Sequence, residues 1–306
     1  METLNFTVAG LPFEVTAESA GMLSTLLPSY TPFRRRSAEG DAAMSVALSE
    51  CQLPAAPEGS EKLGHFDSGD CWFDVSRTPD GGYHFVVGER LTGEKAAVLL
   101  AAPRFTACQI SVDPAAPEER RMFGAGNAMM VAFAFMSAHH CVLFMHSSVT
   151  LYGGKGYLFL GHSGTGKSTH SRMWRESVPG AELLNDDNPC LRVFPDGSAR
   201  VYGTPWSGKT PCYRDLSAPV GAVVRIEQWK ENTISREPGL RAFASLLSSC
   251  STMLWDKPSY DAIVRTAEKA VASVPVFTLK CRPDHEAAAV CRAAVCGGEA
   301  GEGAKA

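Results

Sequence analysis

The segment GYLFLGHSGTGKSTHS, residues 156–171, determines how the rest of the chain is interpreted. Its apolar start predicts a β-strand, residues 161–168 fit the pattern G-x-x-x-x-G-K-[ST], and the residues from Lys167 onward can form a helix. A strand, a glycine-rich loop and a helix in this order present backbone N–H groups and the positive end of a helix dipole to an anion. The segment therefore predicts a site for nucleotide phosphate.

Every residue of this loop is expected to contribute to nucleotide binding. Lys167 is expected to reach the β- and γ-phosphates, and the Ser168 hydroxyl to ligate Mg²⁺. The remaining predicted nucleotide-binding residues are Gly161, His162, Ser163, Gly164, Thr165, Gly166 and Thr169.

A second stretch, GTPWSGKT at residues 203–210, fits the same pattern but lacks its context. Pro205 has no N–H to donate, and Trp206 is bulky where the backbone must approach phosphate closely. We expect a loop beside the first site, with Lys209 or Arg214 supplying positive charge to a transferring phosphoryl group. A structural loop whose cations are merely solvated is the alternative.

Two adjacent carboxylates, Asp186 and Asp187, end the apolar run that follows the predicted helix. Such a pair near a phosphate loop suits metal binding, together with Ser168, and proton abstraction from an attacking hydroxyl. Repulsion between the two charges is expected to raise the pKa of one of them. An ordinary solvated turn before Asn188-Pro189 is the alternative.

The stretch from Met145 to Ser171, followed by LLNDDNP, resembles two related families, HPr kinase/phosphorylase and ATP-dependent phosphoenolpyruvate carboxykinase. HPr kinases have a histidine, a strand pair, a glycine-rich loop and an apolar strand ending in Asp-Asp, and the carboxykinases have a Met-His segment, a similar loop and a similar Asp-Asp. The similarity covers roughly residues 142–230. It implies a mixed α/β fold with a P-loop kinase core of this type, binding ATP with Mg²⁺ or Mn²⁺ and assembling as a homo-oligomer.

The resemblance also implies catalytic roles. In the kinase interpretation Asp187 is the general base, Asp186 supports the metal, and His146 assists at the active site. In the carboxykinase interpretation His146 and one aspartate ligate a second divalent metal. The sequence leaves both roles for His146 open.

The sequence departs from both families. No glutamate lies between Glu182 and Glu227, where HPr kinases carry a metal-binding glutamate, and the chain is shorter than a carboxykinase. Segments 219–229 and 274–284 resemble shorter HPr-kinase-like proteins. We therefore expect an ATP-dependent kinase that phosphorylates a hydroxyl, with serine expected, on a protein, peptide or small molecule. The alternatives are a small carboxykinase-like enzyme using oxaloacetate and a non-catalytic nucleotide-binding regulator.

Composition narrows the classes of partner and compartment. The 306 residues are 45% hydrophobic and 20% charged with a net charge of −4, so neither nucleic acid nor a membrane is an expected partner. The ten cysteines form no C-x-x-C pair, which favours free thiols in the reducing cytoplasm. The apolar run 127–145 contains two histidines and predicts a buried helix rather than a membrane span.

Local patterns suggest three regions. Residues 1–115 alternate as strands, with turns at Gly10 and at 79–82, and are expected to recognise a substrate or partner. Residues 116–296 are expected to form the nucleotide-binding kinase-like domain, beginning with a helix over 117–140. The tail, 297–306, is small and polar and is expected to be disordered.

Overall fold

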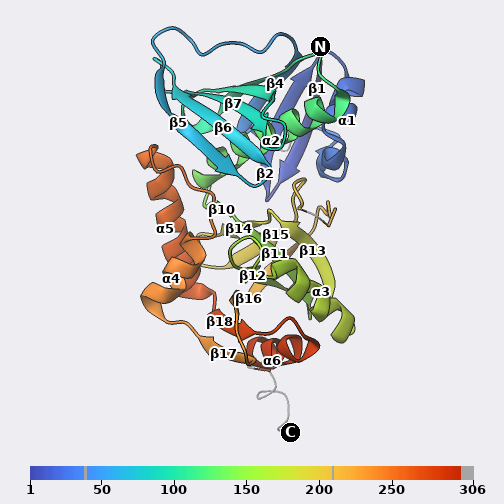
Figure 1. Cartoon of the computed structure of the whole chain (residues 1–306), viewed down its shortest axis with the longest axis vertical. Helices are drawn as coiled ribbons and strands as arrows, with labels where there is room; N and C mark the ends of the chain where they lie inside the picture. Colours follow the sequence, from blue (N-terminus) through green and yellow to red (C-terminus); the bar gives the residue numbers. More distant parts are fainter. Residues whose placement is uncertain (38–39, 209, 298–306) are drawn as a thin grey trace. The chain divides into compact units, whose positions relative to one another are not determined.

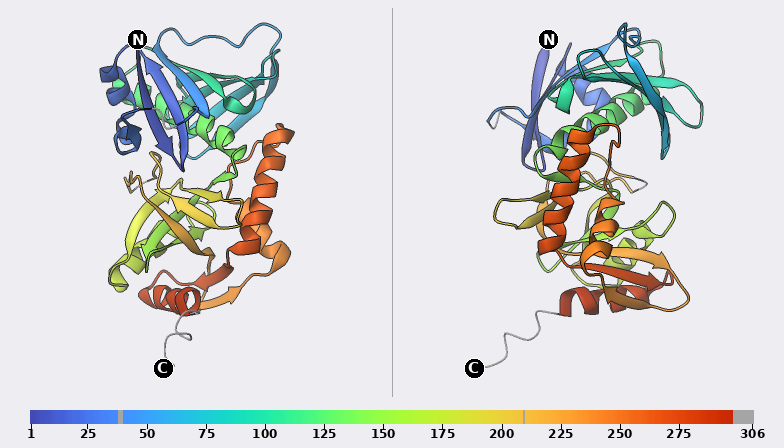
Figure 2. Two further views of the ribbon diagram at one scale, coloured as in Figure 1. Left: turned by 180° about the vertical axis from the view of Figure 1, so that it is seen from behind. Right: turned by 90° about the vertical axis from the view of Figure 1, so that its left-hand side faces the viewer.

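A computed structural model describes residues 1–37, 40–208 and 210–297 (Figure 1, Figure 2). The chain divides into two compact units, Met1–His140 with Met253–Ser259, and Cys141–Thr252 with the residues from Tyr260 onward. Each unit contains helices and a nine-stranded sheet. The expected mixed α/β class and the β-rich N-terminal region are therefore confirmed. Lys209 and residues 298–306 lie outside the described residues.

The first unit contains one large sheet. Its strands are β1 (Glu2–Val8), β2 (Leu11–Ala17), β3 (Arg34–Arg35), β4 (Met44–Glu50), β5 (Glu61–Ser68), β6 (Cys71–Arg77), β7 (Tyr83–Glu89), β8 (Lys95–Ala101) and β9 (Ala107–Val112). Their order in the sheet is β3-β1-β2-β4-β9-β8-β7-β6-β5. The first unit also contains α1 (Ala20–Leu26) and the short 3₁₀ segments η1 (Pro28–Phe33) and η2 (Pro103–Phe105).

Both hairpin turns expected in this region are present. β1 and β2 pair antiparallel around Ala9 and Gly10, whose φ values of 53° and 70° suit a tight turn. β6 and β7 pair antiparallel around the second turn, where the Gly81 N–H donates to the Thr78 carbonyl at 2.9 Å. Alternation around turn residues thus predicted these strands correctly.

Helix α2 (Glu118–Ala138) packs on the sheet of the first unit, chiefly on β8. A Cβ on Gly124 would lie 2.4 Å from the Ala96 carbonyl oxygen, so the helix and strand approach too closely for any larger residue. The helix was expected to open the second domain at residue 116, but the two units divide after His140. Its apolar residues are buried against the sheet, and this packing assigns the helix to the first unit.

The apolar run 127–145 is split between two elements. Helix α2 ends at Ala138, and the run continues as strand β10 (Val142–Phe144) after a turn. Among the described helices, none combines the length and the apolar character needed to cross a membrane. The expected buried helix is thus present over the first part of the run only.

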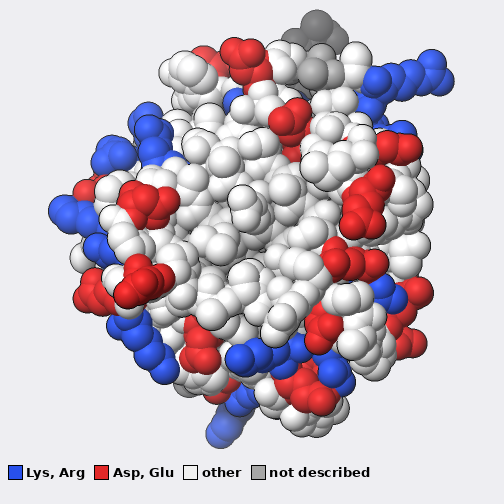
Figure 3. Space-filling view, turned by 90° about the horizontal axis from the view of Figure 1, so that it is seen from above, with Lys and Arg blue, Asp and Glu red and all other residues white. Residues whose placement is uncertain are grey.

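The face seen from above in Figure 3 has a central area without Lys, Arg, Asp or Glu side chains. Lys, Arg, Asp and Glu side chains alternate around its rim, and neither sign dominates there. This mixture agrees with the small net charge of −4.

The second unit contains the remaining elements. Its other strands are β11 (Ser147–Tyr152), β12 (Lys155–Leu160), β13 (Glu182–Asp187), β14 (Cys190–Val193), β15 (Ala199–Tyr202), β16 (Ser217–Gln228), β17 (Thr233–Arg236) and β18 (Val276–Cys281). The sheet order is β10-β14-β15-β16-β12-β11-β13, with β18 pairing with β16 and with β17. The helices are α3 (Lys167–Ser177), α4 (Gly239–Leu247), α5 (Lys257–Ser273) and α6 (His285–Cys296).

A compact core holds α3 and α6 against this sheet. Trp174 of α3 is fully buried and packs edge-on against Phe159 of β12, with ring centroids 5.5 Å apart. Leu279 of β18 and Cys291 of α6 belong to the same cluster of buried side chains. Because this cluster fixes α3 on the sheet, the first residues of the helix stay at the end of β12.

Strand directions bring three chain segments to one edge of the sheet. β11 runs antiparallel to both of its neighbours, β12 and β13. Its first residue, Ser147, pairs with Leu160 on one side and with Asp187 on the other. The residue before it, His146, therefore lies between the glycine-rich loop and the acidic pair.

Candidate functional site

The expected strand, loop and helix are all present around residues 161–168. β12 ends at Leu160, and α3 begins at Lys167 with Gly166 as its N-terminal cap. Gly164 and Gly166 have φ values of 81° and 107°, in a region of conformational space that other residues rarely adopt. The glycines at these positions are therefore required by the path of the loop.

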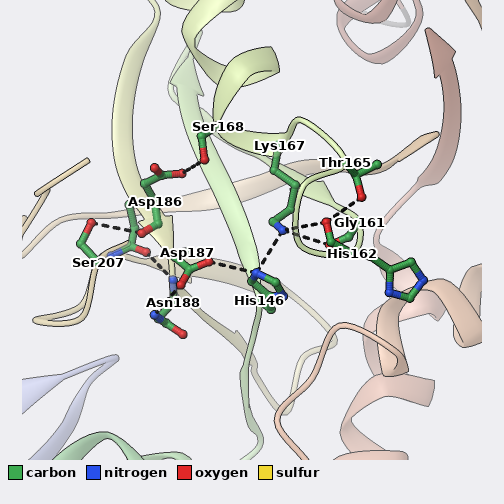
Figure 4. A network of polar contacts seen from close by, with 11 residues as sticks. His146, Gly161, His162, Thr165, Lys167, Ser168, Asp186, Asp187, Asn188 and Ser207 are labelled. Atoms are coloured by element: carbon green, nitrogen blue, oxygen red, sulfur yellow. Dashed lines mark hydrogen bonds and ion pairs between the residues drawn. The ribbon is translucent and has the colours of Figure 1, made fainter. Parts of the chain in front are cut away.

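Lys167 turns back into the loop that precedes it. Its side chain is only 7% exposed, and Nζ donates to the Gly161 carbonyl at 3.0 Å and the His162 carbonyl at 3.4 Å (Figure 4). Burial lowers the pKa of Lys167, and the nearby carboxylates of Asp187 and Asp186 oppose that shift. A cation held by backbone carbonyls at the start of a helix can turn toward a bound anion without leaving the loop.

His146 links the lysine to the acidic pair. Its Nε2 lies 3.0 Å from Lys167 Nζ and 3.0 Å from Asp187 Oδ1. A single ring nitrogen either donates a proton or accepts one, so it bonds to Asp187 or to Lys167 at any moment and not to both. The three side chains form a short chain along which a proton position can shift.

The carboxylate of Asp187 stays ionised in this setting. Its hydrogen bond with His146 lowers its pKa, and the charges of His146 and Lys167 lower it further, while burial opposes the shift. The rise in pKa that was expected for one of the two aspartates therefore does not occur at Asp187. Its φ of 101° is unusual for a residue other than glycine, and strain of this kind is common at functional positions.

Asp186 is directed toward the start of α3. It is 2% exposed, and its Oδ1 accepts a hydrogen bond from the Ser168 hydroxyl at 2.9 Å. Successive residues of a strand point to opposite faces, so the two aspartates contact different partners (Figure 4). One carboxylate is paired with the helix, and the other with His146.

In the second pattern match, residues 203–208 form a loop beside the acidic pair. The Gly208 N–H and the Ser207 hydroxyl both donate to the Asp186 carbonyl, at 2.7 and 3.1 Å. A Cβ on Gly208 would lie 2.9 Å from Asp187 Cβ. No helix follows within the described residues up to β16. The Gly208 N–H therefore bonds to β13 and is not available to phosphate.

The side chain of Asn185 fastens this loop to the strand. Its Nδ2 donates to the Trp206 carbonyl at 2.9 Å and to Thr204 Oγ1 at 3.2 Å, and its Oδ1 accepts from the Asn188 N–H at 3.0 Å. Trp206 is buried and packs edge-on against Phe144. The bulky residue that argued against a phosphate loop is therefore a packing residue.

Arg214 and Lys209 were the two cations expected to lie beside the site. Arg214 donates to the Leu183 carbonyl at 2.7 Å and pairs with Glu182 Oε2 at 2.8 Å. Glu182 begins β13 and Asp187 ends it, so the length of the strand, at about 3.3 Å per residue, separates this guanidinium from the site. The structure does not bring Arg214 to the acidic pair. Lys209 lies outside the described residues.

The other loop residues remain open to solvent or lie near it. His162 and Ser163 are exposed, and Thr169 is half-buried in the first turn of α3. Thr165 closes the loop on itself, donating from Oγ1 to the His162 carbonyl at 2.6 Å. All of them lie on the segment that carries Lys167 and Ser168.

The site offers few side chains that could ligate a divalent metal. Within the described ranges, no group of three or more His, Cys, Asp and Glu side chains is arranged to hold a metal ion. Mg²⁺ in phosphotransferases needs only one or two protein oxygens, because phosphate oxygens and water complete its octahedron. Ser168 and Asp186, joined at 2.9 Å, fit that requirement, with Asp187 following on the same strand end.

Sequence reasoning missed some residues of the site. Ser207 and Gly208 belong to the second match to G-x-x-x-x-G-K-[ST]. That pattern is typical of phosphate binding and did not predict their contact with β13. No sequence pattern indicated Gln228, yet its Nε2 donates to the Gly164 carbonyl at 3.3 Å. Its position depends on the parallel pairing of β12 and β16, which are far apart in the chain.

Comparison with models of known protein families gave no match, and comparison with curated protein sequences gave none either.

Proposed function

We propose that the chain is an ATP-dependent phosphotransferase of the HPr-kinase-like type, which transfers the γ-phosphate to a hydroxyl, with serine as the preferred acceptor group. One observation carries the proposal: Lys167 and Asp187 lie on either side of His146, each 3.0 Å from its Nε2, while Ser168 bonds to Asp186. The groups proposed to hold phosphate and the carboxylate proposed to face the acceptor thus lie at one edge of the sheet.

The residues divide the work of such a transfer. Lys167 and the loop N–H groups hold the phosphates, and Ser168 with Asp186 would hold Mg²⁺, which neutralises charge on the phosphate oxygens when bound. Asp187 would accept the hydrogen bond of the acceptor hydroxyl that attacks the terminal phosphate. Phosphoryl transfer depends mostly on positioning and electrostatic stabilisation, so an ionised carboxylate that accepts the hydroxyl's hydrogen bond suits this role.

His146 has a definite part in this scheme. When a phosphate takes Lys167 away from Nε2, the imidazole is left to donate to Asp187 and to orient its carboxylate. The second-metal role for His146, drawn from the carboxykinase resemblance, finds less support, because no third metal-ligating side chain joins His146 and Asp187 among the described residues.

A screen of hydroxyl acceptors with γ-labelled ATP and Mg²⁺ tests the proposal. Free serine, serine peptides and small proteins are the first acceptors, and Asp187→Asn is the first variant. We expect label transfer by the wild type and about 10²- to 10⁴-fold slower transfer by Asp187→Asn, with ATP binding retained. Asp196→Asn is the control, since Asp196 bonds only within its own turn to Ser198 among the described residues.

Three results would count against the proposal. Normal transfer by Asp187→Asn would remove Asp187 from the reaction. ATP binding without transfer to any acceptor would favour a nucleotide-binding regulator. Turnover of oxaloacetate with ATP and Mn²⁺, in the absence of hydroxyl phosphorylation, would favour the carboxykinase-like alternative.

A further inference from the structure

Gln228 ends strand β16 and reaches the glycine-rich loop from the side away from the acidic pair. β16 is parallel to β12, and Arg225 pairs with Leu160, so β16 continues three residues beyond the end of β12. The Gln228 side chain donates from Nε2 to the Gly164 carbonyl at 3.3 Å and, more weakly, to the Thr165 carbonyl at 3.5 Å. The carboxyl end of β16 is therefore in direct contact with the loop.

The next residue, Trp229, is an exposed aromatic side chain. It is 57% exposed although its backbone is fixed, because its N–H donates to the Cys281 carbonyl of β18 at 2.9 Å. Lys280 Nζ lies 4.8 Å from the centre of the indole ring, a cation–π contact that orients the ring. The ring is therefore both accessible and held in one orientation at the carboxyl end of β16, as a stacking platform for a planar ligand must be.

The direction of a bound nucleotide follows from the order of the strands. β18, β16, β12, β11 and β13 lie side by side, and the groups that act on the terminal phosphate, Ser168 and Asp187, are on the β13 side of the loop. The nucleoside must then extend the other way, over β16 and β18. Both are parallel to β12, so their carboxyl ends meet at the same edge, where open α/β sheets bind ligands.

The spacing suits a nucleoside. Neighbouring strands lie about 4.8 Å apart, so β18 is two spacings, on the order of 10 Å, from the strand that carries the loop. That span covers the path from a phosphate in the loop, across the end of β16, to the ring of Trp229 beside Lys280 of β18.

We propose that Trp229 forms the nucleoside subsite, in which the base stacks on the indole, while the Gln228 side chain, on the opposite face of β16, holds the end of the strand against the loop. This inference rests on the proposed function and adds the residue that recognises the nucleoside. Stacking tolerates any base, because every base has a π-face. The ligand class is a nucleoside triphosphate, and inorganic tripolyphosphate is the matching probe that lacks the base.

Calorimetric titration of the full chain with ATP and with tripolyphosphate, both with Mg²⁺, tests the subsite. For Trp229→Ala we expect ATP to bind about 5- to 150-fold more weakly, the effect of losing one base–aromatic stack, and tripolyphosphate to bind as to the wild type. Trp229→Phe keeps a π-face and should retain most of the ATP affinity. Leu240→Ala is the control, because Leu240 is 80% exposed on α4 and should change neither affinity.

Each other outcome overturns the inference in a distinct way. Wild-type ATP affinity in Trp229→Ala, with both ligands bound by the wild type, removes the subsite and leaves the proposed function standing. Equal losses for ATP and tripolyphosphate would show that Trp229 supports the loop instead of the base. A wild type that binds neither ligand would overturn the proposed function and the subsite together.

Discussion

Residues 161–168 and 203–210 fit one sequence pattern, and the described residues of the two stretches form different structures. The first connects the buried strand β12 to α3, and its glycines adopt left-handed backbone conformations. The second lies between β15 and β16, and its Gly208 N–H is bonded to the Asp186 carbonyl. The pattern alone does not make an anion site; free backbone donors at the start of a helix do.

The two lysines of these stretches provide the sharpest test of that difference. Lys167→Ala should abolish measurable ATP binding and lower transfer by about 10³-fold, because it removes the cation nearest the phosphates. Lys209→Ala should leave ATP binding unchanged. Equilibrium titration of both variants measures this, and a comparable loss of ATP affinity in the two would mean that both stretches hold phosphate.

The residue after each lysine provides a second pair. Ser168→Ala removes a hydroxyl that bonds to Asp186 at 2.9 Å and is proposed to contact Mg²⁺. We expect about 10²-fold slower transfer and a higher Mg²⁺ requirement, whereas Thr210→Ala should stay within about 3-fold of the wild type. Rates measured across a Mg²⁺ titration decide the matter, and an unchanged Mg²⁺ requirement in Ser168→Ala would contradict the metal assignment.

Gly208 tests whether the second loop shapes the acidic site. The new methyl of Gly208→Ala would lie 2.9 Å from Asp187 Cβ and should displace that carboxylate. We expect transfer to fall about 10-fold with ATP affinity unchanged, since small displacements of reacting groups are costly. Gly126→Ala is the matched control, because a Cβ there meets no heavy atom within 4 Å. Equal activity of the two variants would show that the second loop does not position the Asp187 carboxylate.

His170 should make folding stability sensitive to acid. It is 1% exposed, its ring nitrogens have no hydrogen-bond partner among the described residues, and burial lowers its pKa from 6.5 to about 4. Between about pH 6.5 and 4, His170 is therefore protonated in the unfolded chain and neutral in the folded chain. Stability should fall as pH falls through that window, by up to about 3 kcal/mol.

The substitution His170→Leu isolates this effect. It replaces the imidazole with an apolar group of similar volume in a site where the ring packs edge-on against Phe159. Chemical unfolding at pH 7 and at pH 4.5 should show a smaller acid-induced loss in the variant than in the wild type. An identical loss in both proteins would mean that other groups cause the acid sensitivity.

Much of the fold was predictable from local sequence. The turn at Gly10, the hairpin around 79–82 and the helix from Lys167 all follow from turn chemistry and periodicity, which act over a few residues. The domain boundary was not predictable in the same way. Its position depends on which sheet buries α2, and an apolar helix fits either neighbour until tertiary packing decides.

The candidate site was likewise predictable only where local sequence determines it. Short apolar strands ending in polar residues predicted that the loop and the acidic pair would meet, and Ser147 brings them together by pairing with both Leu160 and Asp187. The lowered pKa of Asp187 was not predicted, because the influence of His146 depends on that pairing. Arg214 was misplaced since its ion pair with Glu182, 32 residues away in sequence, leaves no local signal.

The central claim is that Lys167 and Asp187 face one bound nucleotide across His146. A crystal structure with Mg²⁺ and a non-hydrolysable ATP analogue tests this most directly. We expect the terminal phosphate between Lys167 Nζ and the Asp187 carboxylate, with the metal on Ser168 and the base toward Trp229. A triphosphate seated on residues 203–210, or bound with its terminal phosphate away from Asp187, would contradict the account.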